Sequence, residues 1–208
     1  MRDESLMRRA EEHLKASGRR MAGLVESIGP CQITYTDPTF ESLARSIVYQ
    51  QISIRAARSI YLKLCDTCRL GDCLLPEHLL KLNEPQLRAC GLSGQKARYL
   101  LDLAAKTSDG LVEFDRFPEM EDADVIAELT QVKGIGLWTA QMFLLFSLRR
   151  VDIWPTGDLG IRNAVKKLHR LKEVPTAQQT EQRGRKWRPY GSIASWYLWR
   201  SLEPTGPF

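Results

Sequence analysis

The stretch VDIWPTGDLGIRNAV contains a carboxylate, Asp158, directly after a turn rich in Pro and Gly and at the start of a predicted helix. An ionised carboxylate can stabilise a positive charge that develops nearby, or it can orient and deprotonate a water molecule. Aspartate is also a common helix N-cap, because its side chain accepts hydrogen bonds from the first turn. The two roles are compatible, so Asp158 is the first candidate for chemistry.

A second candidate site lies upstream in LTQVKGIGLWTA, where Gly134 and Gly136 precede an apolar helix. Glycine permits a positive φ and, lacking Cβ, lets another backbone approach closely. Amides at a helix N-terminus form an anion site that suits a phosphate, and Lys133 adds positive charge. A C-cap glycine before an unrelated core helix is the alternative. We favour the phosphate-binding turn because the pattern reads as helix, hairpin and second helix.

Composition sets broad limits on the protein class. The chain has 208 residues, 43% of them hydrophobic, which is enough for one sizeable core or two small lobes. Its formal charge of +5 and pI near 9.0 favour an anionic partner, although solubility alone also explains them. There is no run of ~20 apolar residues for a membrane span, and the charged start lacks the apolar core of a signal peptide. We expect a soluble intracellular protein.

Helical periodicity dominates the chain and predicts an all-α fold. Over residues 40–64, Leu43, Ile47, Ile54 and Tyr61 fall on one helical face, which we expect in the core. Further helices are predicted to start at Asn83-Glu84-Pro85, within 91–106, at Asp122 or Asp124 as cap, after Asp158, and over 193–202. The polar and then basic stretch 176–189 predicts a surface loop or short helix.

The five cysteines, an odd number without a secretion signal, predict reduced thiols rather than a disulfide framework. Cys65, Cys68 and Cys73 nevertheless have a spacing that could hold a metal, with Cys90 or His78 as the fourth ligand. A structural zinc site is the less favoured interpretation, because no second paired motif is present. Small buried or surface thiols are favoured.

The hairpin followed by Asp158 resembles the helix-hairpin-helix DNA glycosylases, whose hairpin grips the DNA backbone without reading sequence. YQQIS at 49–53 and WRPYGSIASWYLWR at 187–200 are similar to motifs of the alkylbase branch, the 3-methyladenine DNA glycosylase II type. The resemblance covers roughly residues 38–203. One departure is Gly191, where many relatives carry a basic residue.

The resemblance implies a single glycosylase domain, 1–208, with a two-lobed helical fold and a central cleft. Residues 42–152 would form a six-helix barrel that includes the hairpin at 129–146. Residues 1–41 plus 153–208 would form a terminal helical lobe, with Asp158 in the cleft beside the hairpin.

The activity implied is that of a monofunctional DNA glycosylase, which flips an N-alkylated purine such as 3-methyladenine out of DNA and hydrolyses its N-glycosidic bond. Flipping costs a few kcal/mol, and an aromatic pocket recovers the lost stacking. Trp138, Trp199 and Tyr197 are candidate walls, although aromatic residues at helical spacing more often belong to a core. Cation–π attraction would add ~0.5–2 kcal/mol for the positively charged alkylated base.

A cationic base leaves without protonation, so a single carboxylate is sufficient, and Asp158 would stabilise the sugar cation and guide water. Gln51, by its position in YQQIS, resembles the wedge that relatives insert into the gap left by the flipped nucleotide. A solvated polar side chain is the alternative interpretation of Gln51.

Bifunctional relatives such as the endonuclease III group use a lysine two residues after the second hairpin glycine as a nucleophile. Here that position is Trp138, and no cysteine follows Cys90, so we expect no lyase activity and no C-terminal four-cysteine cluster. No catalytic cofactor is expected. In relatives, hairpin carbonyls bind a monovalent cation, which would assign Na or K to the carbonyls of Thr130, Val132 and Ile135.

The expected partner is double-stranded DNA with alkylated bases, the expected state is a monomer, and no membrane is involved. The protein would lie at the nucleoid in the cytoplasm of a prokaryote or in the nucleus of a eukaryote. Two alternatives remain open: a glycosylase for hypoxanthine or an oxidised base, and a non-catalytic helix-hairpin-helix DNA-binding module. Asp158 and the tryptophans count against the second, because DNA grip alone needs neither.

Overall fold

The computed structural model describes residues 4–68 and 74–202, which contain helices, turns and loops but no strand. The all-α prediction is confirmed. The chain divides into two compact units: a terminal unit, formed by the described residues up to Tyr35 together with those from Arg149 onward, and a hairpin unit, Thr36–Leu148. The lobe boundaries expected from the resemblance, 42 and 152, fall a few residues later. No helix of the described part is long and apolar enough to cross a membrane.

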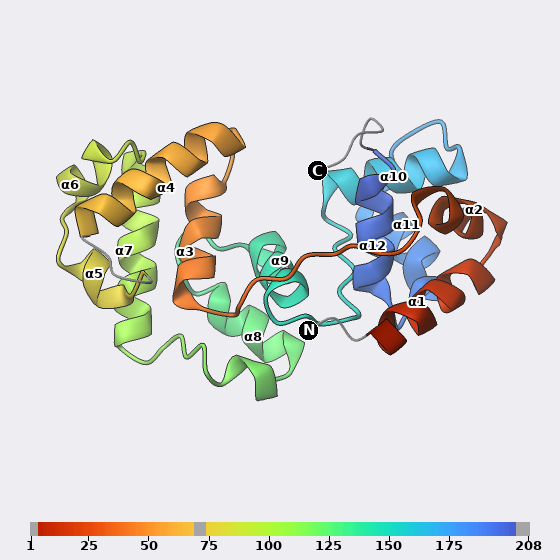
Figure 1. Ribbon diagram of the computed structural model, residues 1–208, viewed down its shortest axis with the longest axis horizontal. Helices are drawn as coiled ribbons and strands as arrows, with labels where there is room; N and C mark the ends of the chain where they lie inside the picture. Colours follow the sequence, from red (N-terminus) through yellow and green to blue (C-terminus); the bar gives the residue numbers. More distant parts are fainter. Residues whose placement is uncertain (1–3, 69–73, 203–208) are drawn as a thin grey trace. The chain divides into compact units, whose positions relative to one another are not determined.

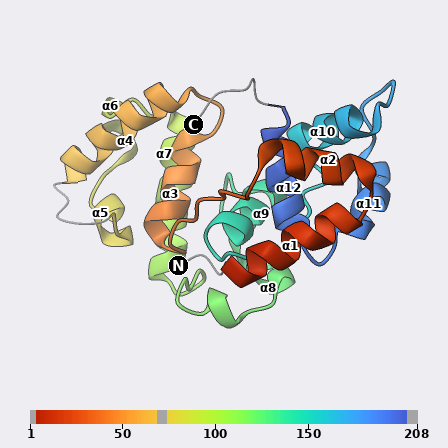
Figure 2. The same cartoon turned by 45° about the vertical axis from the view of Figure 1, so that its right-hand side comes forward.

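The terminal unit brings together helices from both ends of the chain. It contains α1 Glu4–Ala16, α2 Arg19–Ile28, α10 Leu159–His169, α11 Ala177–Gly184, the 3₁₀ turn η2 Arg185–Trp187 and α12 Gly191–Arg200. Helices α1 and α2 both pack against α12, as Figure 2 shows. The surface prediction for 176–189 is wrong at Trp187, which is fully buried because its ring packs edge-on against that of Trp154, 5.1 Å away.

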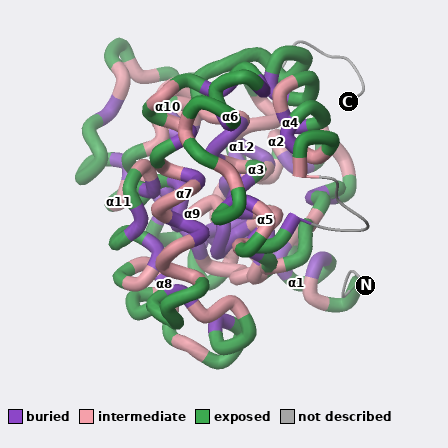
Figure 3. Tube along the Cα trace, turned by 90° about the vertical axis from the view of Figure 1, so that its left-hand side faces the viewer, coloured by how far each residue is buried: buried purple, intermediate pink, exposed green. Residues whose placement is uncertain are grey.

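The hairpin unit is built around α3, α7 and the hairpin itself. It contains α3 Phe40–Tyr49, α4 Ile54–Cys68, α5 Pro76–Leu80, α6 Glu84–Ala89, α7 Gly94–Ser108, the 3₁₀ turn η1 Phe117–Glu119, α8 Asp122–Leu129 and α9 Leu137–Phe146. Helix α7 contacts α3, α5 and α6, while α8 packs against α9 (Figure 1). In Figure 3 buried segments gather around α7 and α9. An edge-to-face cluster of Phe40, Phe114, Phe117 and Phe143 forms part of the core.

The single helical face expected over 40–64 is interrupted, because α3 ends at Tyr49 and α4 begins at Ile54. Between them Gln51 has a φ of 54°, which takes the chain out of the right-handed helical region. The break changes the phase of the second helix. Ile54, predicted to be buried, is therefore 73% exposed, whereas Leu43, Ile47 and Tyr61 are buried as expected.

The predicted helix starts are partly confirmed. Asn83 caps α6, accepting a hydrogen bond from the Gln86 amide, and the Gln86 side chain accepts one from the Asn83 amide. Neither Asp122 nor Asp124 caps α8, because the helix begins at Asp122 itself and Glu121 occupies the cap position without a side-chain hydrogen bond. Both aspartates lie in the first turn, where negative charge is favourable to the helix dipole.

Four described cysteines, Cys31, Cys65, Cys68 and Cys90, carry free thiols. Cys73, the third member of the candidate zinc motif, lies outside the described residues. Within the described residues, no group of three or more His, Cys, Asp or Glu side chains could hold a metal ion.

The surroundings of the two hairpin glycines differ: a Cβ is excluded at Gly134 but has room at Gly136. Gly134 has a φ of 83°, and a Cβ placed on it would lie 2.0 Å from the ring of Tyr99 on α7. Gly136, the N-cap of α9, has an ordinary φ of −95°, and a Cβ there would meet no atom within 4 Å. Gly134 is therefore required by the packing of the turn, whereas Gly136 leaves open space in front of α9.

We predict that Gly134→Ala destabilises the protein by at least about 2 kcal/mol, because the left-handed backbone and the ring contact both oppose a Cβ. Gly136→Ala is the matched control and should change the free energy of unfolding by less than about 0.5 kcal/mol. Urea unfolding of both variants measures the difference. Equal stabilities would show that the Tyr99 contact does not hold the turn.

Candidate functional site

The carboxylate of Asp158 is held at the N-terminus of α10 by two donors. Its Oδ1 accepts a hydrogen bond of 2.7 Å from the Ile161 amide and one of 3.0 Å from Nε1–H of Trp199. The first bond makes Asp158 the N-cap of α10, as the sequence predicted. The second ties the carboxylate to α12, so that two helices fix the orientation of one side chain.

Gly160 allows the indole of Trp199 to reach the carboxylate. A Cβ at this position would lie 2.9 Å from Asp158 Oδ1 and 3.2 Å from the nearest Trp199 ring carbon. The first distance is shorter than real Cβ contacts and the second is tighter than most, so a larger residue would shift the carboxylate or the indole. The Trp199 side chain is only partly buried.

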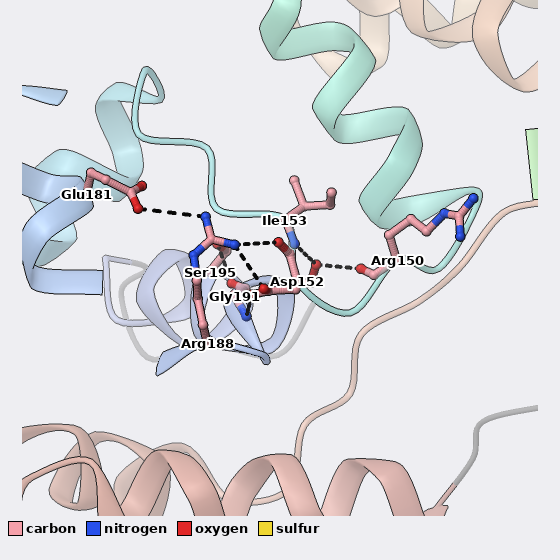
Figure 4. A network of polar contacts seen from close by, with 8 residues as sticks. Arg150, Asp152, Ile153, Glu181, Arg188, Gly191 and Ser195 are labelled. Carbon is pink, nitrogen blue, oxygen red and sulfur yellow. Dashed lines mark hydrogen bonds and ion pairs between the residues drawn. The ribbon is translucent and has the colours of Figure 1, made fainter. Parts of the chain in front are cut away.

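The segment that leads to Asp158 is fastened to the start of α12 through Asp152. Its Oδ1 accepts the Gly191 amide at 3.0 Å, and its Oδ2 accepts from the Arg188 guanidinium at 2.9 Å, as Figure 4 shows. A Cβ on Gly191 would lie 2.9 Å from Asp152 Oδ1 and 3.1 Å from the Ile153 carbonyl. Glycine at this position fits the close approach of the segment to α12.

Ser192 makes the second half of this connection. Its hydroxyl donates to the Arg150 carbonyl at 2.5 Å and accepts the Ile153 amide at 2.9 Å, while its own amide donates to Val151 at 3.0 Å. Beyond them, Arg188 reaches Glu181 at 3.8 Å (Figure 4). Three main-chain groups of the segment before Asp158 thus have hydrogen-bond partners on Ser192, which limits the freedom of the segment.

Tyr197 lies in the core of the terminal unit. It is fully buried, and its hydroxyl lies 2.9 Å from the Gly29 carbonyl and 3.1 Å from the Glu11 carboxylate. Burial raises the pKa of Tyr197 and keeps the phenol neutral. Because both the ring and the hydroxyl are used in packing α12 against α1 and α2, we assign Tyr197 to this core rather than to the wall of a base pocket.

In the hairpin unit, Trp138 and Gln51 lie on one cavity of about 580 Å³. Trp138, on the first turn of α9, is 49% exposed, and Gln51 is exposed at the turn after α3. The cavity is also lined by residues of α3, α9 and the turns beside them, namely Ser46, Tyr49, Gln50, Gly134, Thr139 and Met142. A half-exposed indole beside such a cavity can stack on a planar group.

Lys133, at the tip of the hairpin turn, contacts Asp102 through both its amide and its ammonium group. Its amide donates to Asp102 Oδ2 at 2.8 Å, and its ammonium lies 3.5 Å from Asp102 Oδ1, although the side chain is 71% exposed. Burial alone would raise the pKa of Asp102, but the hydrogen bonds and charges of Lys106 and Lys133 hold that pKa below its usual range. The Lys133 amide is therefore committed to Asp102.

Five residues around the hairpin were not identified from the sequence: Gln50, Lys96, Tyr99, Asp102 and Lys106. Four of them lie on α7 at spacings of three or four, which places them on one helical face. A polar stripe on a helix normally faces solvent, so its spacing gave no reason to single it out. Gln50 was overlooked because its neighbour Gln51 carried the motif resemblance.

A glycine hairpin between two helices and a capping aspartate are the features expected of a helix-hairpin-helix DNA repair enzyme. Residues 44–189 match the HhH-GPD superfamily base excision DNA repair proteins, and the chain belongs to this superfamily. The chain is 33% identical over 199 residues to DNA-3-methyladenine glycosylase 1 of Schizosaccharomyces pombe, covering 94% of this chain and 87% of the relative.

Two solved structures are similar over nearly the whole chain. One is the Schizosaccharomyces pombe 3-methyladenine DNA glycosylase Mag1 in complex with abasic DNA, with 32% identity and a TM-score of 0.80 over 93% of this chain and 96% of that one. The other is a DNA-3-methyladenine glycosidase from Bacillus halodurans, with 34% identity and a TM-score of 0.83 over 92% and 88% of the two chains.

Proposed function

We propose that this protein is a monofunctional DNA glycosylase of the 3-methyladenine DNA glycosylase II type, which excises N-alkylated purines such as 3-methyladenine in base excision repair. The relatives from Schizosaccharomyces pombe and Bacillus halodurans are named as a DNA-3-methyladenine glycosylase and a DNA-3-methyladenine glycosidase, which supports the substrate class of the proposal. The observation that carries the proposal is the Asp158 carboxylate held on one oxygen by the Ile161 amide and the Trp199 indole.

Asp158 is the catalytic residue of the proposed reaction. As the N-glycosidic bond breaks, positive charge develops on the sugar, and a fixed carboxylate stabilises it without having to reorient. The bonding electrons leave with the alkylated base, whose positive charge they neutralise, so no acid is required. Water then adds to the sugar while the carboxylate orients it and accepts its proton. Trp199 acts through Asp158 as a positioning residue.

Trp138 and Gln51 are assigned to the nucleotide that leaves the stack. The half-exposed indole of Trp138 beside its cavity would stack on the flipped base, with cation–π attraction of ~0.5–2 kcal/mol favouring the alkylated form. The side chain of Gln51, which is exposed at the turn after α3, would fill the gap in the duplex.

The hairpin supplies grip on the DNA backbone. The first amides of α9 have no acceptor within the helix, and the open space at Gly136 lets a phosphate approach them. Gly134 supports this arrangement by shaping the turn, and the exposed ammonium of Lys133 adds charge. These contacts recognise phosphate and not base, so the grip is independent of sequence.

A Na or K ion bound by the carbonyls of Thr130, Val132 and Ile135 fits the turn chemically, because carbonyl oxygens are the hard donors that such cations prefer. Val132 also accepts the Ile135 amide at 3.1 Å, which leaves its oxygen a second lone pair for a cation. The ion would add positive charge next to a DNA phosphate. No step of the chemistry depends on it.

The proposed partner is double-stranded DNA with alkylated bases, bound by a monomer. The proposed location follows from the substrate: the nucleoid in a prokaryotic cell, or the nucleus in a eukaryotic one.

The central test replaces Asp158 by Asn, which keeps an oxygen that can accept from both Ile161 and Trp199 but removes the charge. Excision from duplexes that each hold one defined lesion should fall at least about 10³-fold, while binding to lesion DNA persists. The same panel on the unaltered protein should show release of N-alkylated purines ahead of hypoxanthine and oxidised bases. Near-normal excision by the Asn variant would end the proposed mechanism.

Trp199→Phe tests the positioning of the carboxylate separately, because it keeps an aromatic ring and removes the Nε1–H donor. Hydrogen bonds to charged groups contribute about 1.5–3 kcal/mol, so single-turnover excision should slow roughly ten- to hundredfold. Affinity for an abasic-site analogue should stay within about threefold. A loss confined to affinity would instead make Trp199 a binding surface.

Strand cleavage separates this protein from bifunctional relatives. The proposed mechanism leaves an abasic site with both strands intact, since Trp138 offers no amine at the position of the lyase lysine. Incubation with lesion DNA and borohydride should therefore trap no covalent complex, and the strand should break only after added alkali. A robust adduct that disappears when one lysine is replaced would show that the nucleophile has been assigned wrongly.

A further inference from the structure

One face of α7 contacts both the turn that carries Gln51 and the hairpin. The Lys96 ammonium donates to the carbonyls of Val48 and Gln50, at 2.7 and 2.6 Å. These carbonyls end α3, where a cation is favourable to the helix dipole. Burial lowers the pKa of Lys96, which is half-buried at this position. The start of the Gln51 turn is therefore attached to α7 by two charge-assisted hydrogen bonds.

The same face of α7 holds the hairpin through its next residues. The ring of Tyr99 occupies the space beside Gly134, and Asp102 accepts the Lys133 amide at 2.8 Å. Lys106, one turn further along, donates to Asp102 at 2.7 Å and to the Gln131 carbonyl at 2.7 Å. The hairpin is thus attached to α7 at three residues of its turn.

Gln50 links the two attached segments directly. Its side-chain amide donates to the Gly134 carbonyl at 3.1 Å and lies 3.5 Å from the Thr139 hydroxyl on α9. Its own main-chain carbonyl is one of the two acceptors of Lys96. Gln50 is therefore the residue through which the α7 contacts and the hairpin contacts meet.

Gln51 itself has a left-handed backbone with a φ of 54°. For a residue other than glycine this conformation costs roughly 1–2 kcal/mol, and it persists where the surroundings impose it. The surroundings are the attachments on either side of the turn: Lys96 at Val48 and Gln50, and Gln50 at the hairpin. The Gln51 side chain is therefore exposed, while its backbone is held in place by neighbouring contacts. A side chain that inserts into DNA needs both properties.

We propose that Lys96 and Gln50 are positioning residues that hold the Gln51 turn in a fixed position relative to the hairpin. Because the hairpin, in the proposed function, binds the DNA backbone, the Gln51 side chain then stays in place while it displaces the base from its pair. This inference rests on the proposed glycosylase function. It predicts a specific defect: when these contacts are broken, a lesion that must be unpaired is excised slowly. A lesion that is already unpaired is excised nearly normally, because little force is required.

The test measures single-turnover release of N7-methylguanine from two duplexes, one with cytosine opposite the lesion and one with an abasic analogue opposite. Lys96→Met keeps the length of the side chain and removes both hydrogen bonds, so release from the paired duplex should slow by about tenfold or more. Release from the unpaired duplex should change by less than about threefold. Gln50→Met, which introduces no buried charge, should show the same pattern.

Lys81→Met, at an exposed lysine after α5, is the matched control and should leave both rates unchanged. A second control places Lys96→Met in a Gln51→Ala protein. If Lys96 acts through Gln51, it should then have little further effect on the ratio of the two rates. Thermal unfolding of each variant identifies any loss of folded protein.

Equal slowing on both duplexes, or no slowing on either, would overturn the positioning role. So would a Lys96→Met effect that is undiminished in the Gln51→Ala protein. Failure of the unaltered protein to release N7-methylguanine from either duplex, together with failure to release 3-methyladenine in the lesion panel, would instead reject the proposed function. The two failures are therefore distinguishable.

Discussion

The hydrogen bond between the Trp199 indole and the Asp158 carboxylate is the constraint on which the terminal unit depends. It requires α12 to lie close to the first turn of α10, and Gly160 provides the necessary space. It also requires the preceding segment to follow α12 closely, which the Asp152 and Gly191 contact achieves. Tyr197 on α12 is buried against the N-terminal helices, and this contact fixes the position of α12 itself. A single carboxylate is oriented by packing that extends through the whole unit.

In the hairpin unit the packing fixes two turns, the one that carries Gln51 and the hairpin itself, rather than a single side chain. Loops fixed by few apolar contacts open easily. In the hairpin the apolar contacts come from the buried side chains of Val132 and Ile135 and from the ring of Tyr99 beside Gly134. Polar groups of α7 supply the rest by accepting or donating at the main chain of both turns. Such hydrogen bonds specify geometry strongly, because leaving a partly buried amide or carbonyl unpaired costs about 1–3 kcal/mol.

Features that depend on local pattern could be predicted from the sequence, among them Asp158 as N-cap and the all-α class. The predicted burial of Ile54 is wrong, because it assumed one continuous helix over residues 40–64. The left-handed backbone of Gln51 breaks that helix, and the sequence pattern does not show this break. Contacts between distant residues could not be predicted in this way. Lys96 is of a type that usually faces water, and only the fold shows that Trp199 and Asp158 act as one group. A role that consists of orienting another residue leaves little signal in sequence spacing.

Charge is distributed unequally between the two units, and this bears on how DNA is held. The terminal unit contains 18 of the 30 Lys and Arg residues but 10 of the 25 Asp and Glu residues, which leaves an acidic excess in the hairpin unit. Under the proposed function, net charge would therefore attract DNA mainly to the terminal unit. In the hairpin unit, the proposed attraction relies on oriented groups, the amides at the start of α9 together with the exposed Lys133 ammonium, which act only at short range. The proposed grip by the hairpin thus depends on geometry more than on the net charge of its unit.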